Sequence, residues 1–282
     1  GGMTGPSREA ALTVRVLSQQ EAGERLRRAG LLAGRALLVG AALLAWSAAS
    51  GTVVDAQFVS DPLSVARALA ALAASGRLWP NLGQTVAEVL IGYLLGGGLG
   101  VAVALLVGVV PTAQRVLRPF LLAFYAIPKI ALAPLIVMWF GLGLAPKVLL
   151  AAIFVFFVVF MNVVTGIFSV SPHLVATLRV MGASRTTLLW KVTLPSTIPY
   201  LTSGLRIGIP EAMIGAVIGE FMAATRGLGY LVNAAAAQFN TTVTLAAIAA
   251  LVGVVVLMDG VLTLAEARLL RWRPRAVLAG RA

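Results

Sequence analysis

The sequence contains no cysteine and only one histidine, His173, so two common kinds of chemistry are missing from the start. Without cysteine there is no disulfide and no thiolate metal site, and one histidine cannot form a cluster of imidazole ligands. Charged residues are also scarce, at 11% of the 282 residues. A typical soluble protein carries about 25%. These shortages argue against a metal centre and against a water-soluble surface.

Phosphate-binding loops are absent as well. No G-x-x-x-x-G-K-[ST] motif occurs, and the glycines at 96–98 and 100 lie within an apolar run instead of between a strand and a helix. The chain is therefore expected to hold no nucleotide cofactor and no metal. No cluster of nucleophile, base or metal ligands is indicated either, which argues against an integral membrane enzyme.

Long apolar runs dominate what is present, because hydrophobic residues make up 60% of the chain. An almost uncharged run of about 18 residues or more is typical of a helix that crosses a bilayer. The sequence thus predicts an all-α, polytopic membrane protein in which a polar cytoplasmic tail, residues 1–30, precedes one membrane domain, residues 31–282. About six spans are predicted, at 31–54, 81–110, 117–142, 147–169, 199–224 and 243–266.

The N-terminal part allows more than one interpretation. The first run follows basic residues and ends in small residues at 45–50, as a signal peptide does, but it is long and further spans follow. We therefore expect an uncleaved helix. Residues 55–80 are amphipathic and carry Trp79, which is typical of a segment lying along the membrane surface.

The surplus of basic residues is explained by topology. Lys and Arg number 22 against 10 Asp and Glu, a net charge of +12, which in a soluble protein would suggest nucleic-acid binding. With six spans and both termini in the cytoplasm, the cytoplasmic segments hold 16 of the 22, and the outer segments hold four, including Lys147 and Arg226. Cytoplasmic loops are enriched in basic residues in this way. We therefore expect contact with the lipid membrane and no nucleic-acid partner.

The segment at about 170–198 is more polar than the spans beside it and is rich in helix start and stop signals. A serine–proline pair predicts the start of a short helix, 172–180, which Gly182 can end in a left-handed conformation. A second serine predicts another short helix, 185–192, which Leu194-Pro195 is expected to end before the fifth span begins.

Eight apolar side chains in this segment are too many to face water on an ordinary loop. Some of them must pack against the chain's own spans, and the rest indicate a protein partner. They are Leu174, Val175, Leu178, Val180, Met181, Leu188, Leu189 and Trp190.

The segment resembles the cytoplasmic signature of the binding-protein-dependent ABC importer permeases, an EAA element followed by glycine and then by Ile-x-Leu-Pro. Gly182 and Leu194-Pro195 match at the family's spacing, and Val192 is a conservative match. Ala176 departs from the pattern, because the family usually has Glu there. The resemblance implies a coupling loop that docks in a groove of an ATPase subunit. Its residues here are His173, Ala176, Thr177, Leu178, Gly182, Ala183, Ser184, Leu194 and Pro195.

Residues 127–143, 181–201 and 214–231 resemble the nitrate/taurine/sulfonate branch of that family, which also includes permeases for bicarbonate and for pyrimidine or riboflavin precursors. The resemblance implies a type I importer fold and a transport subunit that is not an enzyme. It also implies a homodimer in the bacterial inner membrane, paired with two cytoplasmic subunits that bind ATP and magnesium. An extracytoplasmic solute-binding protein is expected to deliver a small polar or anionic solute.

Ionisable residues at membrane depth are costly and usually functional, although many simply pair between helices. Those expected within the spans are Glu88, Lys129, Arg206, Glu211, Glu220 and Asp259. The fifth span is the preferred wall of a translocation path, because Pro210 deprives one backbone carbonyl of its helical partner and this is tolerated beside a cavity. The path candidates are Lys129, Arg206, Pro210, Met213, Val217 and Glu220.

Two alternatives stay open at this point. Gly-x-x-x-Gly stripes at 92–100 and 204–208 let helices approach closely, either within one subunit or across a dimer. The rival function is a proton-coupled secondary transporter that uses Glu211, Glu220 or Asp259 as a relay. Such a transporter predicts inverted repeats, which the sequence does not show.

Overall fold

The computed structural model describes residues 33–109 and 127–269, together with the isolated positions 27, 30, 31, 116 and 123. The chain divides into two compact units, Gly1–Ser64 and Val65–Ala282. Among the described residues the regular structure is helical, apart from one isolated bridge between Ser50 and Val54. The predicted all-α class is therefore confirmed.

The first unit contains an apolar helix, Ala33–Ala49, and the short helix α2, Ala56–Val59. The Asp55 side chain caps α2 by accepting a hydrogen bond from the backbone N–H of Gln57 at 2.9 Å. The predicted first span, 31–54, thus ends early, and most of the predicted tail 1–30 lies outside the described residues.

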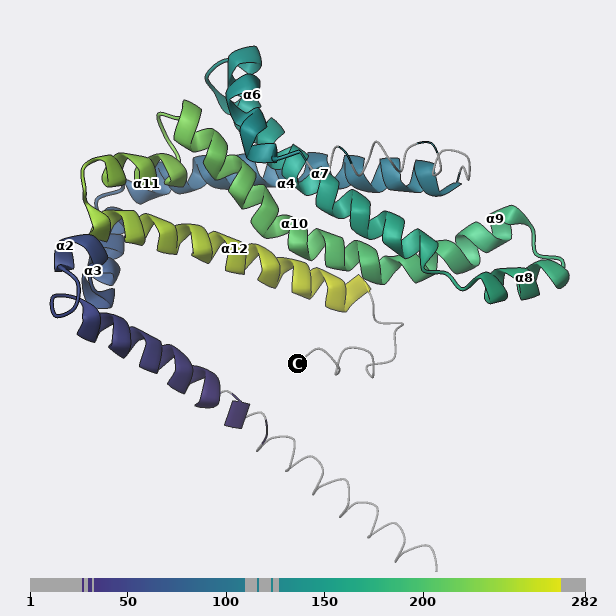
Figure 1. Cartoon of the computed structure of the whole chain (residues 1–282), viewed down its shortest axis with the longest axis horizontal. Coiled ribbons are helices and arrows are strands. Elements are labelled where there is room, and N and C mark those ends of the chain that lie inside the picture. The colour runs from purple at the N-terminus through teal and green to yellow at the C-terminus, as the bar shows by residue number, and fades with distance from the viewer. Residues whose placement is uncertain are drawn as a thin grey trace, which may run out of the picture. The chain divides into compact units, whose positions relative to one another are not determined.

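The second unit carries the long helices (Figure 1). Four helical stretches in the described part of the chain are long and apolar enough to cross a membrane, and they correspond to the second, fourth, fifth and sixth predicted spans. Helix α3, which begins just before this unit, covers Pro62–Ala74. The elements that follow are α4 (Leu78–Val109), η1 (Lys129–Leu132), α6 (Ala133–Phe140), α7 (Leu144–Phe168), α8 (Pro172–Val180), α9 (Arg185–Leu188), η2 (Leu189–Thr193), α10 (Leu194–Ala223), α11 (Leu228–Ala237) and α12 (Thr241–Leu269).

Helix α7 lies at the centre of this unit, packed against both α4 and α10. The α4 glycines Gly92, Gly96 and Gly100 face α7 so closely that an added Cβ would collide with its atoms. On α10, a Cβ added at Gly204 would collide with Asn162 of α7, and one added at Gly208 would be crowded by Val155. These glycine stripes therefore pack helices within one subunit, which decides the alternative that the sequence left open.

The third predicted span, 117–142, is not one continuous helix in its described part. Lys129 begins a 3₁₀ turn directly after Pro128, and the α-helical part, α6, covers only Ala133–Phe140. Proline has no backbone N–H and disfavours a helical conformation of the residue before it, so an uninterrupted helix is prevented here. The predicted span is therefore interrupted at Pro128, and Lys129 lies in the first turn after the interruption.

The predicted helix end at Leu194-Pro195 was also wrong, because α10 begins there and continues through Pro199. The preceding five residues, Leu189–Thr193, form a π-helical turn. This wider turn changes the hydrogen-bond register, and Pro195 then falls in the first turn of α10, where a missing N–H costs little.

The segment 55–80, predicted to lie on the membrane surface, comprises α2, α3 and the start of α4. Trp79 already belongs to α4 and is exposed, and its indole N–H donates to the carbonyl oxygen of Ala73 at 3.1 Å. The position of this segment along a membrane stays a prediction.

Replacing Gly96 by alanine is expected to destabilise the protein, because the new methyl group would overlap the backbone carbonyl of Ala152. Overpacking of this kind costs about 1–3 kcal/mol. Gly98→Ala is the matched control, since an added Cβ at Gly98 meets nothing within 4 Å. Thermal unfolding of the purified protein should show a lower melting temperature for Gly96→Ala only, and equal melting temperatures for the two variants would contradict close α4–α7 packing.

Candidate functional site

The predicted helix–glycine–helix segment is present at one end of the long helices, where α8 and α9 lie (Figure 1). Helix α8 ends in a Schellman motif, in which the N–H of Gly182 donates to the carbonyl of Arg179 at 3.0 Å and the N–H of Ala183 donates to that of Leu178 at 2.9 Å. Gly182 has φ +84°, as predicted, a conformation that glycine adopts without strain.

Polar side chains fix both ends of this turn. The Ser184 hydroxyl caps α9 by accepting a hydrogen bond from the backbone N–H of Thr187 at 3.1 Å. The Thr177 hydroxyl donates to the carbonyl of His173 at 2.9 Å, and both residues are exposed together with Ala176. The turn therefore has a defined shape without contacts from a partner.

The apolar residues of the segment divide as expected. Leu188 is buried, and Val175, Leu178 and Leu189 are half-buried. The other four are exposed by 46% to 89%, namely Leu174, Val180, Met181 and Trp190. An exposed apolar group of this size on a loop with fixed geometry is typical of a protein–protein contact.

The segment is joined to the long helices through an apolar cavity of about 220 Å³. Trp190, Leu194 and Pro195 form its wall on the loop side, and residues of α4, α7 and α10 complete it. Leu194 and Pro195 are therefore half-buried supports of the loop rather than exposed contact residues.

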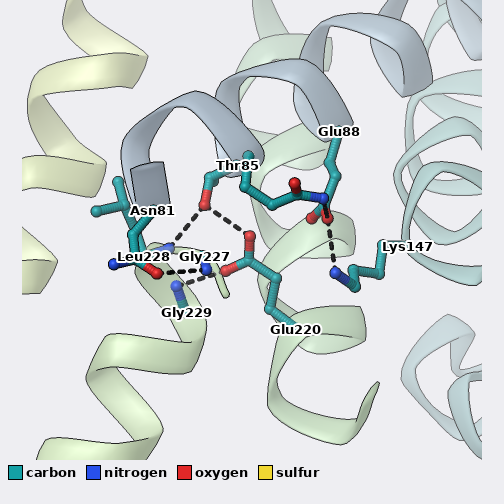
Figure 2. A network of polar contacts seen from close by, with 9 residues as sticks. Asn81, Thr85, Glu88, Lys147, Glu220, Gly227, Leu228 and Gly229 are labelled. Atoms are coloured by element: carbon teal, nitrogen blue, oxygen red, sulfur yellow. Dashed lines mark hydrogen bonds and ion pairs between the residues drawn. The ribbon is translucent and has the colours of Figure 1, made fainter. Parts of the chain in front are cut away.

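A buried polar network occupies the opposite end of the same helices (Figure 2). Glu220, near the end of α10, accepts a hydrogen bond from the Thr85 hydroxyl of α4 at 2.6 Å and another from the backbone N–H of Gly229. Thr85 accepts in turn from the N–H of Leu228 at 2.7 Å. Glu220 is 1% exposed, so these bonds replace the water that its carboxylate would otherwise bind.

The turn that begins α11 is shaped around this carboxylate. Gly227 has φ +134°, and a Cβ added at Gly227 or at Gly229 would collide with the carboxylate of Glu220. The N–H of Gly227 donates to the Asn81 side chain at 2.8 Å. Glu220 therefore holds the first turn of α11 against α4 and α10, and only glycine fits at the two contact points.

An ion pair lies beside this network. Lys147 of α7 contacts Glu88 of α4 at 2.7 Å, and Gln84 donates to the same Glu88 oxygen, Oε1, at 2.7 Å. Lys147 and Glu88 are 4% and 0% exposed. The second oxygen of Glu88, Oε2, is buried and has no hydrogen-bond partner among the described residues. Lys147 was expected in an outer loop, but it is a buried residue of the first turn of α7.

The path candidates do not form one continuous surface in the chain. Met213 and Glu220 are buried, Val217 and Lys129 are half-buried, and Arg206 and Pro210 are exposed. The Lys129 ammonium lies over the ring of Phe154, 5.3 Å from its centroid. Only the exposed residues of α10 can line a translocation path, because Met213 and Glu220 pack inside the subunit.

Arg206 pairs with carboxylates of α12. This agrees with the alternative in which the charges within the spans simply pair between helices. Its guanidinium contacts Glu266 at 2.9 Å, Asp259 at 3.5 Å and the Thr263 hydroxyl at 3.0 Å. The side chain of Arg206 is still 47% exposed and that of Asp259 is 46% exposed. This group is thus an ion-pair cluster that remains open to its surroundings.

The comparison with protein families decides the class of the protein. Residues 96–271 match the family described as "Binding-protein-dependent transport system inner membrane component". The chain belongs to this family. The permease resembles the taurine transport system permease protein TauC of Escherichia coli (strain K12), with 31% identity over 232 residues that cover 80% of this chain and 84% of TauC.

A second relative and one solved structure agree with this assignment. The permease is 36% identical over 198 residues to the riboflavin transport system permease protein RibX of Chloroflexus aurantiacus, covering 70% of this chain and 74% of RibX. It shares its fold with a chain of the MetNI methionine ABC transporter in inward-facing conformations. That match has a TM-score of 0.55 and 20% identity, and it covers 69% of this chain and 96% of the other.

The protein is therefore the membrane permease subunit of an ABC importer and not itself an enzyme, which excludes the rival secondary transporter. Such a permease works with an ATPase and a binding protein. The sequence predicted the helix–glycine–helix segment but missed the polar network. Glu88 and Glu220 were among the ionisable residues expected within the spans. No local sequence pattern pointed to Asn81 or Thr85, or to the burial of Lys147.

Removing the charge of Lys147 alone should destabilise the permease strongly. Lys147→Met leaves Glu88 as an uncompensated buried carboxylate, which costs about 3–5 kcal/mol. Adding Glu88→Gln removes that charge, so the double variant should regain most of the lost melting temperature. Thermal unfolding of both variants in detergent measures this difference. A double variant no more stable than Lys147→Met would contradict the pairing.

Proposed function

We propose that the permease forms a homodimer that binds two ATPase subunits and imports a small polar or anionic solute delivered by an extracytoplasmic binding protein. Taurine-like sulfonates are the favoured solute class, because TauC matches over most of both chains. Riboflavin-related compounds and pyrimidine precursors are the second class, and the similarity to RibX, a riboflavin transport permease, supports the first of these. ATP and magnesium are bound by the ATPase subunits, and this chain holds no cofactor.

The exposed apolar loop is the observation that carries the proposal. Val180 and Met181 are 89% and 77% exposed, directly before the left-handed Gly182. Two short helices with an apolar tip are suited to insertion into a groove of another protein. We assign this tip, with His173, Ala176 and Thr177 beside it, to the ATPase interface. Alanine at 176 removes a possible salt bridge to the ATPase and leaves the apolar contact unchanged.

The proposed orientation follows from this assignment. The α8–α9 loop faces the cytoplasm, as do both termini, with residues 1–30 as a cytoplasmic tail before the membrane domain. The polar network of Glu220 and Lys147 then lies at the outer end of the helices. The 16 basic residues in the segments assigned to the cytoplasm support this orientation.

The inner part of the translocation path is assigned to the exposed positions of α10, Arg206 and Pro210. Charges on a lipid-facing surface are costly, whereas Arg206 and Asp259 remain nearly half exposed in the subunit. A water-filled path between two copies of the permease accommodates this exposure. Pro210 leaves the carbonyl of Arg206 without its helical donor, so that oxygen also favours a wet surface.

Gly182→Val should uncouple ATP hydrolysis from transport. An added Cβ at this position meets nothing within 4 Å, so the only penalty is the left-handed backbone conformation, about 1–2 kcal/mol. The valine variant should insert and assemble but lose substrate-stimulated ATPase activity.

Gly182→Asn is its matched control, because asparagine tolerates this conformation. The asparagine variant should retain coupling. Wild-type stimulation in the purified valine complex would contradict the assignment of the loop.

Arg206→Gln should slow uptake several-fold and change the melting temperature little, because half-exposed ion pairs contribute about 0–1 kcal/mol. Arg206→Lys keeps the charge and should retain more uptake. Uptake and melting temperature are measured on the same preparation in proteoliposomes. A destabilised complex with normal uptake per folded molecule would show that Arg206 is only a helix-to-helix bridge.

A further inference from the structure

The ion-pair cluster between α10 and α12 contains more negative than positive charge. Helix α12 lies beside α10 (Figure 1), and Arg206 of α10 contacts two carboxylates of α12, Glu266 at 2.9 Å and Asp259 at 3.5 Å. A guanidinium carries one positive charge and each carboxylate carries one negative charge. One negative charge of the cluster is therefore left without a positive partner.

No other basic residue of these two helices balances this charge. Arg206 is the one Lys or Arg in the sequence of α10, and Arg268 is the one in the sequence of α12. The α12 residues that contact Arg206 are spaced by four and three positions, so Asp259, Thr263 and Glu266 share one face of the helix. Arg268 follows Glu266 by two positions, and at about 100° per residue it lies on the far side of α12.

The two carboxylates differ in how firmly they hold Arg206. Glu266 lies 2.9 Å from the guanidinium and its side chain is 20% exposed, which is the geometry of a charge-assisted hydrogen bond. Asp259 lies 3.5 Å away and its side chain is 46% exposed. Asp259 is therefore the carboxylate whose charge is in excess, and it is accessible from outside the subunit.

Arg206 keeps hydrogen-bonding capacity of its own. A guanidinium has five N–H donors, and the contacts to Glu266, Thr263 and Asp259 use three of them at most. The Arg206 side chain is 47% exposed, so an acid group can reach the remaining donors while Glu266 stays bound. A cation and a carboxylate, both accessible, thus lie next to each other on the proposed path surface.

We propose that Arg206 and Asp259 form a site for a zwitterionic solute, which carries a protonated amine and an acid group a few carbon atoms apart. Asp259 is the residue that selects for the amine. The proposal rests on the proposed function, in which α10 lines the translocation path. An aliphatic amine is protonated at neutral pH, and its N–H groups form charge-assisted hydrogen bonds to a carboxylate. The acid group of the same solute contacts Arg206.

A solute that carries only an acid group fits this cluster poorly. It brings a further negative charge next to Asp259, and like charges that lie close together are costly where little water screens them. A zwitterion adds no net charge, and its amine neutralises the excess charge of Asp259. The cluster therefore narrows the solute class from small anions in general to amino-sulfonates and amino acids.

The test measures solute binding to the intact permease–ATPase complex in nanodiscs, without the binding protein, because that protein makes a selection of its own. The probes are two pairs that differ only in the amine, taurine with ethanesulfonate and β-alanine with propionate. In the wild-type complex, the solute with the amine should bind about tenfold more tightly than its partner, as expected for one hydrogen bond between charged groups.

Three variants of the cluster separate the two roles. Asp259→Asn should remove the preference for the amine, by weakening taurine and β-alanine about tenfold without weakening their partners. Asp259→Glu keeps the charge and should retain the preference. Arg206→Gln should weaken all probes that bind. The matched control is Glu211→Gln, a half-buried carboxylate of α10 that contacts neither residue of the site, which should leave the preference unchanged.

Melting temperatures are measured on the same complexes, and Asp259→Asn should change them little, because half-exposed ion pairs contribute little to stability. Equal binding of both members of each pair to the wild-type complex would overturn the site. An equal loss for both members in Asp259→Asn would show that Asp259 only positions Arg206, which also overturns it. So would a wild-type complex that imports a solute and binds none of the four probes. If the wild-type complex imports no solute with any binding protein, it is the proposed function that fails.

Discussion

The close approach of α7 to α4 and to α10 is the constraint on which the rest of the structure depends. Inside a membrane, helices gain nothing from excluding water from one another, so they associate through tight packing and polar contacts. Glycines on α4 and α10 bring those helices into contact with the α7 backbone at Ala151 and Ala152. This packing places Lys147 of α7 beside Glu88 of α4 and positions α10 so that Glu220 reaches Thr85.

The two ends of the packed helices have opposite character. One end carries an exposed loop whose tip is apolar, and the other end is held by buried carboxylates, a lysine and backbone N–H groups. A rigid group of helices between them can transmit a displacement from one end to the other. An importer requires such a connection, because solute arrives on one side of the membrane and ATP is hydrolysed on the other.

The fold and the loop could be predicted because their signals are local. Apolar run length located four of the helices, and the Ser184 and Gly182 caps fixed the shape of the loop. The polar network could not be predicted, since Thr85 and Glu220 are far apart in sequence and meet only after the helices pack. Two of the wrong helix boundaries, at Pro128 and at Leu194-Pro195, involve proline, which interrupts one helix and lies in the first turn of the other.

The π-helical turn Leu189–Thr193 gives the loop its direction. A single π-helical turn contains one residue more than the stretch of regular α-helix that it replaces. Each residue of an α-helix contributes a rotation of about 100°. Compared with their position in an unbroken α-helix, α9 and the apolar tip that precedes it are therefore rotated about the axis of α10 by about 100°. A single amino acid therefore sets the side of the helix bundle on which the apolar tip of the loop lies, and a family member without this residue would carry the same loop on a different side.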